Sequence, residues 1–221
     1  MKILFVVPYV PDLIRVRPYN LIRFLTQLGH EVTVFTLWTH EFERQAAHHL
    51  EQHCHAVQAF HLPKWQSYLN VLKTVPSRVP LQASYCWHPT LVRHAVQQIQ
   101  AQQEKDPFDV IHVEHLRGAR LGLALKKLCK TPVVWDSVDS ISYLFRQAVA
   151  NSKRGFDRFI TRFELGRTER YERWLTDQFA QTLVTSQADK AALEALRLEA
   201  QSTQRPSNPL LICHANLQPW S

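Results

Sequence analysis

Glycine is scarce in this sequence, with only five glycines among 221 residues. Neither a G-x-G-x-x-G nor a G-x-x-x-x-G-K-[ST] pattern occurs, so the two common glycine-rich loops that hold phosphates are absent. Dinucleotide-dependent dehydrogenases and P-loop enzymes are therefore set aside as function classes.

Long apolar runs and paired cysteines are also absent. No apolar run approaches the ~18 residues that a membrane-spanning helix needs, and the opening MKILFVVPYV reaches Pro8 too early for a secretory leader. The four cysteines, which are Cys54, Cys86, Cys129 and Cys213, form no C-x-x-C pair. A disulfide framework and a zinc ribbon are thus not indicated, and we expect a cytoplasmic protein with reduced cysteines.

Acidic residues are outnumbered, with 19 Asp and Glu against 26 Lys and Arg, which gives a formal charge of +7. This excess favours an anionic partner such as nucleic acid, a phospholipid surface or a phosphorylated ligand. No nucleic-acid recognition motif accompanies the charge, so we expect no nucleic acid partner. The hydrophobic share of 45% is ordinary for one large soluble domain.

Strands and helices are expected to alternate along the chain. The apolar run KILFVVP at 2–8 predicts a buried strand; a helical pattern follows and ends at Gly29, and HEVTVFTL at 30–37 predicts a second strand, parallel to the first. Further strands are predicted near 56–61, 109–113, 132–136, 179–186 and 209–214, and further helices near 41–53, 89–103, 117–128, 154–176 and 187–200. A polar segment interrupted by prolines is expected at 63–89. The fold class is therefore α/β, a doubly wound parallel sheet in a single Rossmann-like domain, with ligands at the carboxyl ends of its strands.

Several segments resemble a known family in the family's order. These are MKILFVVPYVPD, RPYNLIRFLTQLGHEVTVFTL, FDVIHVEHLRGARLGLAL, TPVVWDSVDSIS and RYERWLTDQFAQTLVTSQADKAAL. From residue 1 to about 195 the sequence is similar to the N-terminal, acceptor-side domain of the family-4 (group 1) retaining glycosyltransferases of GT-B fold. The resemblance implies a Rossmann-like domain at 1–205, followed at 206–221 by its last strand and a truncated interdomain linker.

The resemblance also implies a function. A sugar, of hexosyltransferase type, would pass with retention from a nucleotide-sugar donor to a glycan or lipid-linked acceptor in polysaccharide biosynthesis, without a metal or other cofactor. In this family a C-terminal Rossmann-like domain supplies most of the donor pocket, so we expect this chain to be inactive without such a partner. The alternative is a non-catalytic Rossmann-like module that binds an anionic ligand or a protein partner.

Arg15 and Arg17 follow the first predicted strand, near the start of the first helix. Free backbone N–H groups and the helix dipole favour anions at that position. The family often has glycine here to admit the donor phosphates, and two arginine forks can replace it. The two residues are therefore candidates for substrate binding, and the alternative is that both are solvated residues at a helix start.

The stretch FDVIHVEHLRGAR crowds three polar side chains together. Strand alternation places His112 and Glu114 on one face and His115 beyond the strand end. The H-E-x-x-H pattern of zinc enzymes is absent, so no metal is expected. The resemblance implies a histidine here that touches the transferred sugar; by count it corresponds to Glu114, followed by His115, and these two are the catalytic candidates. His112 is interpreted as a buried strand histidine.

Asp136 and Asp139 follow the next strand and are expected to face the same cleft. Two carboxylates act as acid and base when their pKa values are pushed apart. The resemblance favours binding of acceptor hydroxyls instead, so both are candidates for substrate binding. The alternative is a helix N-cap by Ser137, Asp139 or Ser140.

The segment 153–174 combines phenylalanines at helical spacing with many basic residues. Such a helix either lies on an anionic membrane, as peripheral contact at the inner membrane face, or packs its phenylalanines on the sheet and exposes its arginines to water. Both interpretations stay open.

Overall fold

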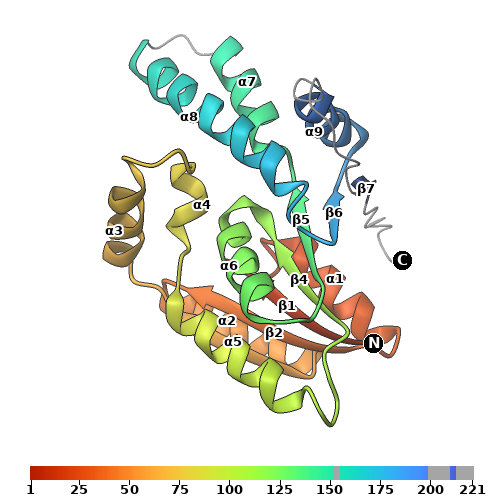
Figure 1. The fold of residues 1–221 in the computed structure, drawn as a ribbon. Coiled ribbons are helices and arrows are strands. Elements are labelled where there is room, and N and C mark those ends of the chain that lie inside the picture. The colour runs from red at the N-terminus through yellow and green to blue at the C-terminus, as the bar shows by residue number, and fades with distance from the viewer. Residues whose placement is uncertain (152–154, 199–209, 213–221) are drawn as a thin grey trace, which may run out of the picture.

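The computed structural model describes residues 1–151, 155–198 and 210–212, and among these it leaves out the side chains of 151 and 155–160. Within this part, seven parallel strands form one sheet in the order β3-β2-β1-β4-β5-β6-β7 (Figure 1). The strands are β1 (Lys2–Val7), β2 (Glu31–Trp38), β3 (Ala56–His61), β4 (Val110–Glu114), β5 (Val133–Val138), β6 (Gln181–Val184) and β7 (Leu210–Ile212). The strand order reverses between β1 and β4, which is where doubly wound sheets bind ligands. The predicted α/β parallel sheet is confirmed.

Helices cover both faces of the sheet (Figure 1). On one face α1 (Val16–Gln27) and α2 (Glu41–Leu50, extended by a 3-10 turn at Glu51–His53) enclose a core that includes Phe5 and Ile22. On the other face α5 (Pro89–Gln102) and α6 (His115–Leu128) pack over a larger core. Because side chains alternate along β4, Ile111 and Val113 enter the larger core while His112 and Glu114 face α1.

Helix α6 lies unusually close to β4. A Cβ atom added at Gly118 would be 3.2 Å from Val113 Cγ1, and one at Gly122 would be 3.0 Å from Val113 Cγ2 and 3.1 Å from Phe179 Cε1. Glycine therefore lets the start of α6 sit directly on the carboxyl end of β4.

The segment 63–89 differs from its expectation. It contains two helices, α3 (Lys64–Thr74) and α4 (Leu81–Tyr85), instead of an irregular polar stretch. Pro63 and Pro80 are their N-caps, and Pro89 is the first residue of α5. A proline at a helix start lacks only an N–H that the helix would leave unpaired, so these prolines begin helices here.

Three further helices complete the described part: α7 (Ile141–Asn151), α8 (Gly155–Leu175) and α9 (Gln187–Leu198). The α7 helix was not anticipated, while the other two match their expected ranges. No helix of the described residues is long and apolar enough to cross a membrane. Most of the expected linker, at 206–209 and 213–221, lies outside the described residues.

The basic segment at 153–174, for which membrane contact and packing on the sheet were both left open, forms α8 from residue 155 on. The side chains of Phe156, Phe159 and Ile160 lie outside the described residues. Phe163 is about half exposed and carries the Arg167 guanidinium over its ring at 5.0 Å, whereas Tyr171 and Leu175 join the larger core. The carboxyl-terminal end of α8 is therefore a packed helix.

Two non-glycine residues have positive φ at neighbouring strand ends. His115, directly after β4, has a φ of 65°, and Val138, the last residue of β5, has a φ of 63°. The Asp136 carboxylate accepts a hydrogen bond from the Val138 N–H at 3.0 Å, at an irregularity in the pairing of β5 with β6. Both turns redirect the chain at the sheet edge where ligands are expected.

Candidate functional site

An open cleft of about 540 Å³ lies at the carboxyl ends of β1, β2 and β4. We call it the carboxyl-edge cleft. Its lining includes Tyr9, Arg15, Lys64, Tyr85, His115 and Arg117. These residues come from the loop after β1, from the start of α3 and from α4 and α6, so the sheet topology gathers distant segments into one site.

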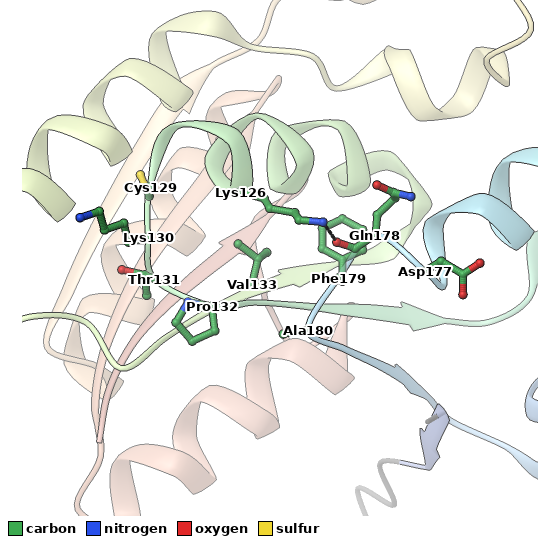
Figure 2. Close-up of a pocket in the computed structure, with 10 residues that line it drawn as sticks. All are labelled: Lys126, Cys129, Lys130, Thr131, Pro132, Val133, Asp177, Gln178, Phe179 and Ala180. Carbon is green, nitrogen blue, oxygen red and sulfur yellow. Dashed lines mark hydrogen bonds between the residues drawn. The ribbon is translucent and has the colours of Figure 1, made fainter. Parts of the chain in front are cut away.

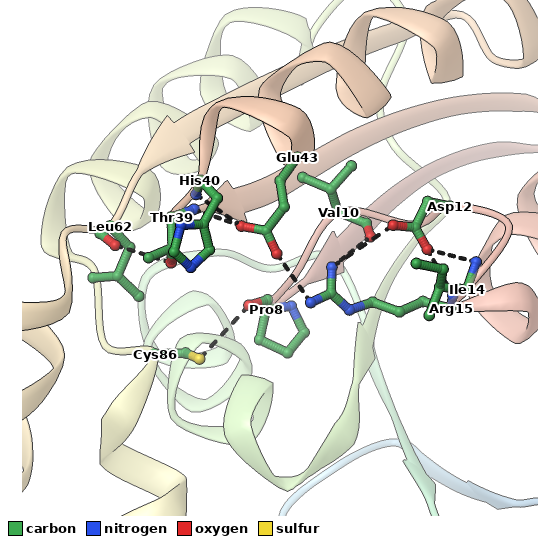
Figure 3. A network of polar contacts seen from close by, with 10 residues as sticks. All are labelled: Pro8, Val10, Asp12, Ile14, Arg15, Thr39, His40, Glu43, Leu62 and Cys86. Atoms are coloured by element: carbon green, nitrogen blue, oxygen red, sulfur yellow. Dashed lines mark hydrogen bonds and ion pairs between the residues drawn. The ribbon is translucent and has the colours of Figure 1, made fainter.

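Arg15 is held in one wall of the cleft (Figure 3). Its guanidinium donates to Glu43 Oε1 at 3.0 Å and lies 5.1 Å from the centre of the Tyr9 ring. Asp12 accepts from the Arg15 backbone N–H and holds the loop before α1. Arg15 was predicted at this helix start; its charge is already balanced by Glu43.

Glu43 fixes the neighbouring wall (Figure 3). One carboxylate oxygen accepts from the backbone N–H groups of Thr39 at 2.7 Å and His40 at 3.1 Å, while the other faces Arg15. Burial opposes ionisation, but these hydrogen bonds and Arg15 hold the pKa of Glu43 below its ordinary value. Glu43 was not among the residues predicted from the sequence; the signal for it was the His-x-x-Glu spacing of a capping box at the start of α2.

His115 lines the floor of the cleft and is uncharged at neutral pH. Burial lowers its pKa to about 4, and the nearby Arg117 adds to the decrease. Its Nδ1 accepts a hydrogen bond from the Arg117 backbone N–H at 3.3 Å. Its ring and the Tyr9 ring are arranged edge to face, with their centres 6.2 Å apart. A neutral imidazole in this position can exchange hydrogen bonds with a substrate hydroxyl.

Beneath the cleft, Arg17 joins two buried carboxylates. Its Nη1 lies 3.1 Å from Glu114 Oε1 and its Nη2 lies 2.7 Å from Asp136 Oδ2. Both carboxyl side chains are fully buried on adjacent strands, where Glu114 and Asp136 stand side by side in the register of β4 and β5. The catalytic candidate Glu114 therefore does not reach the cleft, and the expectation that Asp136 faces it is wrong. Both carboxylates are turned under α1, where they meet Arg17.

Burial also sets the protonation of this cluster. It raises the pKa of Glu114 to about 8; the Asp136 carboxylate adds to the increase and Arg17 opposes it. Burial lowers the pKa of His112 to about 4, although Asp136 opposes this, and the imidazole stacks on Phe5 with a 4.1 Å separation of ring centres. His112 is thus a buried strand histidine, as expected.

Asp139 is set apart from the cluster. Its carboxylate lies 3.4 Å from Thr185 Oγ1, and burial, with the charge of Asp189, raises its pKa. Among the alternatives for a helix cap, Ser140 fits, since its Oγ accepts from the Tyr143 N–H at 3.3 Å.

Glu172, in the Tyr-Glu segment of α8, completes the cap of α7. It accepts from the backbone N–H groups of Ile141 at 2.7 Å and Ser142 at 3.1 Å. Burial nevertheless raises its pKa to about 7. This segment resembles the glycosyltransferase family in sequence, but a structural role for Glu172 was not predicted.

The structure therefore brings together three of the six predicted site residues, Arg17, Glu114 and Asp136, below the cleft. Arg15 and His115 line the cleft and are linked through Tyr9. Sequence reasoning overlooked Tyr9, which directly follows the first strand and its proline, and it overlooked the cleft residues Lys64, Tyr85 and Arg117. No group of three or more His, Cys, Asp or Glu side chains among the described residues is placed to hold a metal ion.

A second hollow, of about 340 Å³, lies at the opposite edge of the sheet, where β5 begins (Figure 2). Its lining includes Lys126, Cys129 and Lys130, and the Lys126 ammonium donates to the Gln178 carbonyl. None of the predicted site residues lines it. The carboxyl-edge cleft is therefore the candidate functional site.

Comparisons with solved structures agree with this architecture. The N-terminal domain of trehalose-6-phosphate phosphatase from Candida albicans aligns with a TM-score of 0.53 and 10% identity, and sucrose-phosphate synthase from Thermosynechococcus elongatus with 0.52 and 14%. Each alignment covers 96% of this chain and 48% of the other, so the chain spans about half the length of these structures. At such identities the likeness shows the fold alone. No curated protein sequence matches the chain.

A family model decides the affiliation. The model of the glycosyl transferase 4-like domain matches residues 14–205, which is most of the chain and includes β2 to β6. The chain therefore belongs to the glycosyl transferase 4-like family and is an N-terminal, Rossmann-like domain of the GT-B type.

Proposed function

We propose that this domain binds the acceptor in the carboxyl-edge cleft and contributes that side of a site for sugar transfer from a nucleotide-sugar donor. The observation that carries the proposal is the cleft itself, which opens at the strand ends of a glycosyl transferase 4-like domain beside the neutral His115 and the Tyr9 ring. Hydroxyl groups of an acceptor sugar suit such a lining, because an imidazole and a phenol both donate and accept hydrogen bonds.

The donor side of the site is proposed to come from a second Rossmann-like domain, in the same chain or in a separate one. Support comes from the span of this chain, which is about half of the two solved structures. Transfer with retention, in which cationic groups and helix N-termini stabilise the leaving diphosphate, is the mechanism that the family resemblance implies.

The buried and the exposed site residues are proposed to have different roles. His115 reaches the cleft and is the catalytic candidate that can touch a substrate. Glu114 is fully enclosed and contacts Arg17, so we assign it as a positioning residue that fixes α1 against β4. Asp136 shares this role, since it holds Arg17 and the turn at Val138.

The charge of the cleft favours an acceptor that carries a phosphate. Lys64 and Arg117 both line the cleft, and neither lies within 4.0 Å of a carboxylate anywhere in the described part of the chain. The Arg117 guanidinium instead lies 5.4 Å from the Tyr85 ring centre, which orients it. Arg15, by contrast, is neutralised by Glu43. Two unbalanced cations beside hydroxyl-binding groups match a lipid-linked or otherwise phosphorylated saccharide.

Turnover tests this function. The 221-residue protein is incubated with a panel of nucleotide-sugars and phosphorylated acceptors, with and without a C-terminal Rossmann-like domain of a related enzyme, and release of nucleoside diphosphate is measured. We expect release only with the added domain, and an α-linked product from an α-linked donor by NMR of the anomeric proton. Release of nucleoside diphosphate by the 221-residue protein without the added domain would contradict the proposal that a second domain supplies the donor side.

Matched variants connect turnover to the cleft. Arg117→Ala should raise the KM for a phosphorylated acceptor at least tenfold with little change for its dephosphorylated form, whereas Lys105→Ala, a charge change remote from the cleft lining, should alter neither. An equal loss with both acceptors would show that Arg117 does not recognise phosphate.

The unbalanced Lys64 and Arg117 also favour a second candidate function, a non-catalytic module that binds an anionic ligand. Isothermal titration with pyrophosphate and with a sugar phosphate separates the two. The binding module would be supported, and sugar transfer rejected, by two results together. The protein binds pyrophosphate or the sugar phosphate in a way that Arg117→Ala abolishes, and no added domain gives turnover of a nucleotide-sugar.

A further inference from the structure

Helix α3 presents an apolar face to solvent. Trp65, Tyr68, Leu69 and Leu72 repeat at three- and four-residue spacing along it, and Val75 directly follows the helix. Their exposed fractions lie between 43% and 66%. We call these five residues the α3 face. Large apolar side chains are ordinarily scattered on a protein surface, so a contiguous stripe of them indicates a docking site.

Helix α8 holds the end of α3 and the start of α4 in place. Arg167 of α8 donates to the carbonyls of Thr74 at 3.1 Å, Val75 at 3.4 Å and Ser77, and so caps the end of α3. The same helix supplies Glu164, whose carboxylate accepts from the Leu81 N–H at 2.8 Å at the start of α4. The carboxyl-terminal end of α3 and the start of α4 are therefore both fastened to α8 through polar contacts. In Figure 1 α3 stands at the outer left of the view, beside α4.

The charged residues of the sequence segment that contains the α3 face are of one sign. Lys64 and Lys73 lie on either side of the apolar stripe, and Arg78 follows in the next turn. Between Glu51 and Glu104 the sequence contains no aspartate or glutamate at all. An apolar stripe with cationic borders and no acidic residue complements a surface that is apolar below and anionic above, as a bilayer with acidic lipids is.

We propose that the α3 face docks on an anionic membrane surface, with Trp65, Tyr68 and Leu72 in the interfacial layer and Lys64, Lys73 and Arg78 among the lipid headgroups. Trp and Tyr suit that layer because each combines an apolar ring with one polar group. A protein partner fits less well. A stable protein interface needs roughly 800 Å² from each side, which is more than five side chains on three helical turns provide.

Membrane docking places the carboxyl-edge cleft beside the lipid. Lys64, the first residue of α3, lines the cleft, and Trp65 of the α3 face follows it directly. A lipid-linked acceptor would then reach the cleft from the bilayer without leaving it. This last step rests on the proposed function, whereas docking itself does not.

Vesicle binding tests the proposal. The 221-residue protein is sedimented with vesicles of phosphatidylcholine alone or with 30 mol% phosphatidylglycerol, at low and at physiological salt. We expect binding to the anionic vesicles that salt weakens. The double variant Trp65→Ser/Leu72→Ser should reduce the partition coefficient more than tenfold, while Leu128→Ser, an exposed apolar residue at the end of α6, should leave it unchanged.

Charge variants address the headgroup contact separately. Lys64→Gln and Lys73→Gln should each weaken binding about fivefold at low salt, because a cation near an anionic surface contributes on the order of 1 kcal/mol. Lys105→Gln and Lys130→Gln, remote from α3, serve as matched controls. Circular dichroism and the melting temperature show that each variant is folded.

Three results would overturn the proposal: no binding to anionic vesicles at low salt, equal losses for Leu128→Ser and the double variant, or a dimer in sedimentation velocity that the double variant dissociates. Because no donor or acceptor is present, failure of vesicle binding leaves sugar transfer untouched. Conversely, vesicle binding without any turnover would reject the proposed function and keep the docking surface.

Discussion

Arg17 Nη1 and Glu114 Oε1 meet at 3.1 Å although 97 residues separate them in the chain. Glu114 is fully enclosed, and the Arg17 side chain is 17% exposed. The pair ties the first turn of α1 to the end of β4, directly under the carboxyl-edge cleft. A guanidinium that holds two carboxylates at once keeps both strand ends in register with the helix above them.

Removal of this cation should destabilise the fold. Arg17→Met leaves Glu114 and Asp136 buried without their partner, and we expect a loss of about 3–5 kcal/mol in the free energy of unfolding, measured by urea titration. Arg23→Met, the same change in the same helix at a residue without an ion pair among the described contacts, should cost under about 1 kcal/mol. Similar losses for the two variants would contradict the structural role of Arg17.

The pH dependence of stability should report Glu114. Its folded pKa of about 8 lies above its ordinary value of 4.5, so the folded state binds the proton more tightly. The contribution is fully present below about pH 4.5 and is lost as the pH rises towards 8. Glu114→Gln, which resembles the protonated form, should therefore gain stability relative to the wild type over that range.

The measurement for Glu114 is the free energy of unfolding at half-unit steps from pH 5 to pH 9. The exposed Glu41→Gln serves as the control and should show the wild-type profile. A Glu114→Gln difference that stays constant with pH would mean that Glu114 is ionised in the folded protein throughout.

Two glycine substitutions should change stability in opposite directions. Gly122→Ala brings a methyl group to 3.0 Å from Val113 Cγ2, and such overpacking costs about 1–3 kcal/mol. Gly166→Ala meets only the end of the Arg170 side chain at 3.8 Å, so helix propensity should add up to about 1 kcal/mol. The melting temperature of each variant, compared with the wild type, tests both expectations. A Gly122→Ala protein that melts at or above the wild-type temperature would contradict the close packing of α6 on β4.

The contact between α8 and α3 should govern local opening. Arg167→Met frees the carbonyls of Thr74, Val75 and Ser77, so amide hydrogen exchange across α3 and α4 should accelerate about tenfold or more while β1 and β4 stay protected. Arg170→Met, on the exposed side of the same helix, is the matched control. Unchanged exchange in α3 would show that other contacts hold it.

The sequence predicted the sheet because its strands carry local signals. KILFVV and EVTVFTLW are continuous apolar runs, and Gly29, with a φ of 81°, ends the helix between them as expected. The α3 helix escaped prediction because its exposed face is apolar and its buried face is polar, the reverse of the usual pattern, and α4, with five residues, is too short to show a helical repeat. Ser67 and Thr74 are buried in α3, where Trp65 and Leu72 are exposed.

The candidate site was predicted in outline and not in detail. Position after a strand correctly identified Arg15, Arg17 and His115 as residues of the carboxyl edge. It could not show that Arg17 contacts both Glu114 and Asp136, because those contacts depend on the placement of α1 over β4. Lys64 and Arg117 were missed for the same reason: their segments converge only in the folded sheet.

The backbone turns at His115 and Val138 have a consequence for which parts of the cleft lining can vary. A β-branched or bulky residue in the left-handed region costs on the order of 1–2 kcal/mol, and here two such turns stand at adjacent strand ends, φ 65° and 63°. Tertiary packing keeps both turns in place, so the backbone at His115, which lines the cleft, is set by the fold itself. Tyr85 of the short α4 helix and Arg117 of α6 contact each other at another part of the cleft lining, so substitutions at these two positions should change the lining without disturbing either turn.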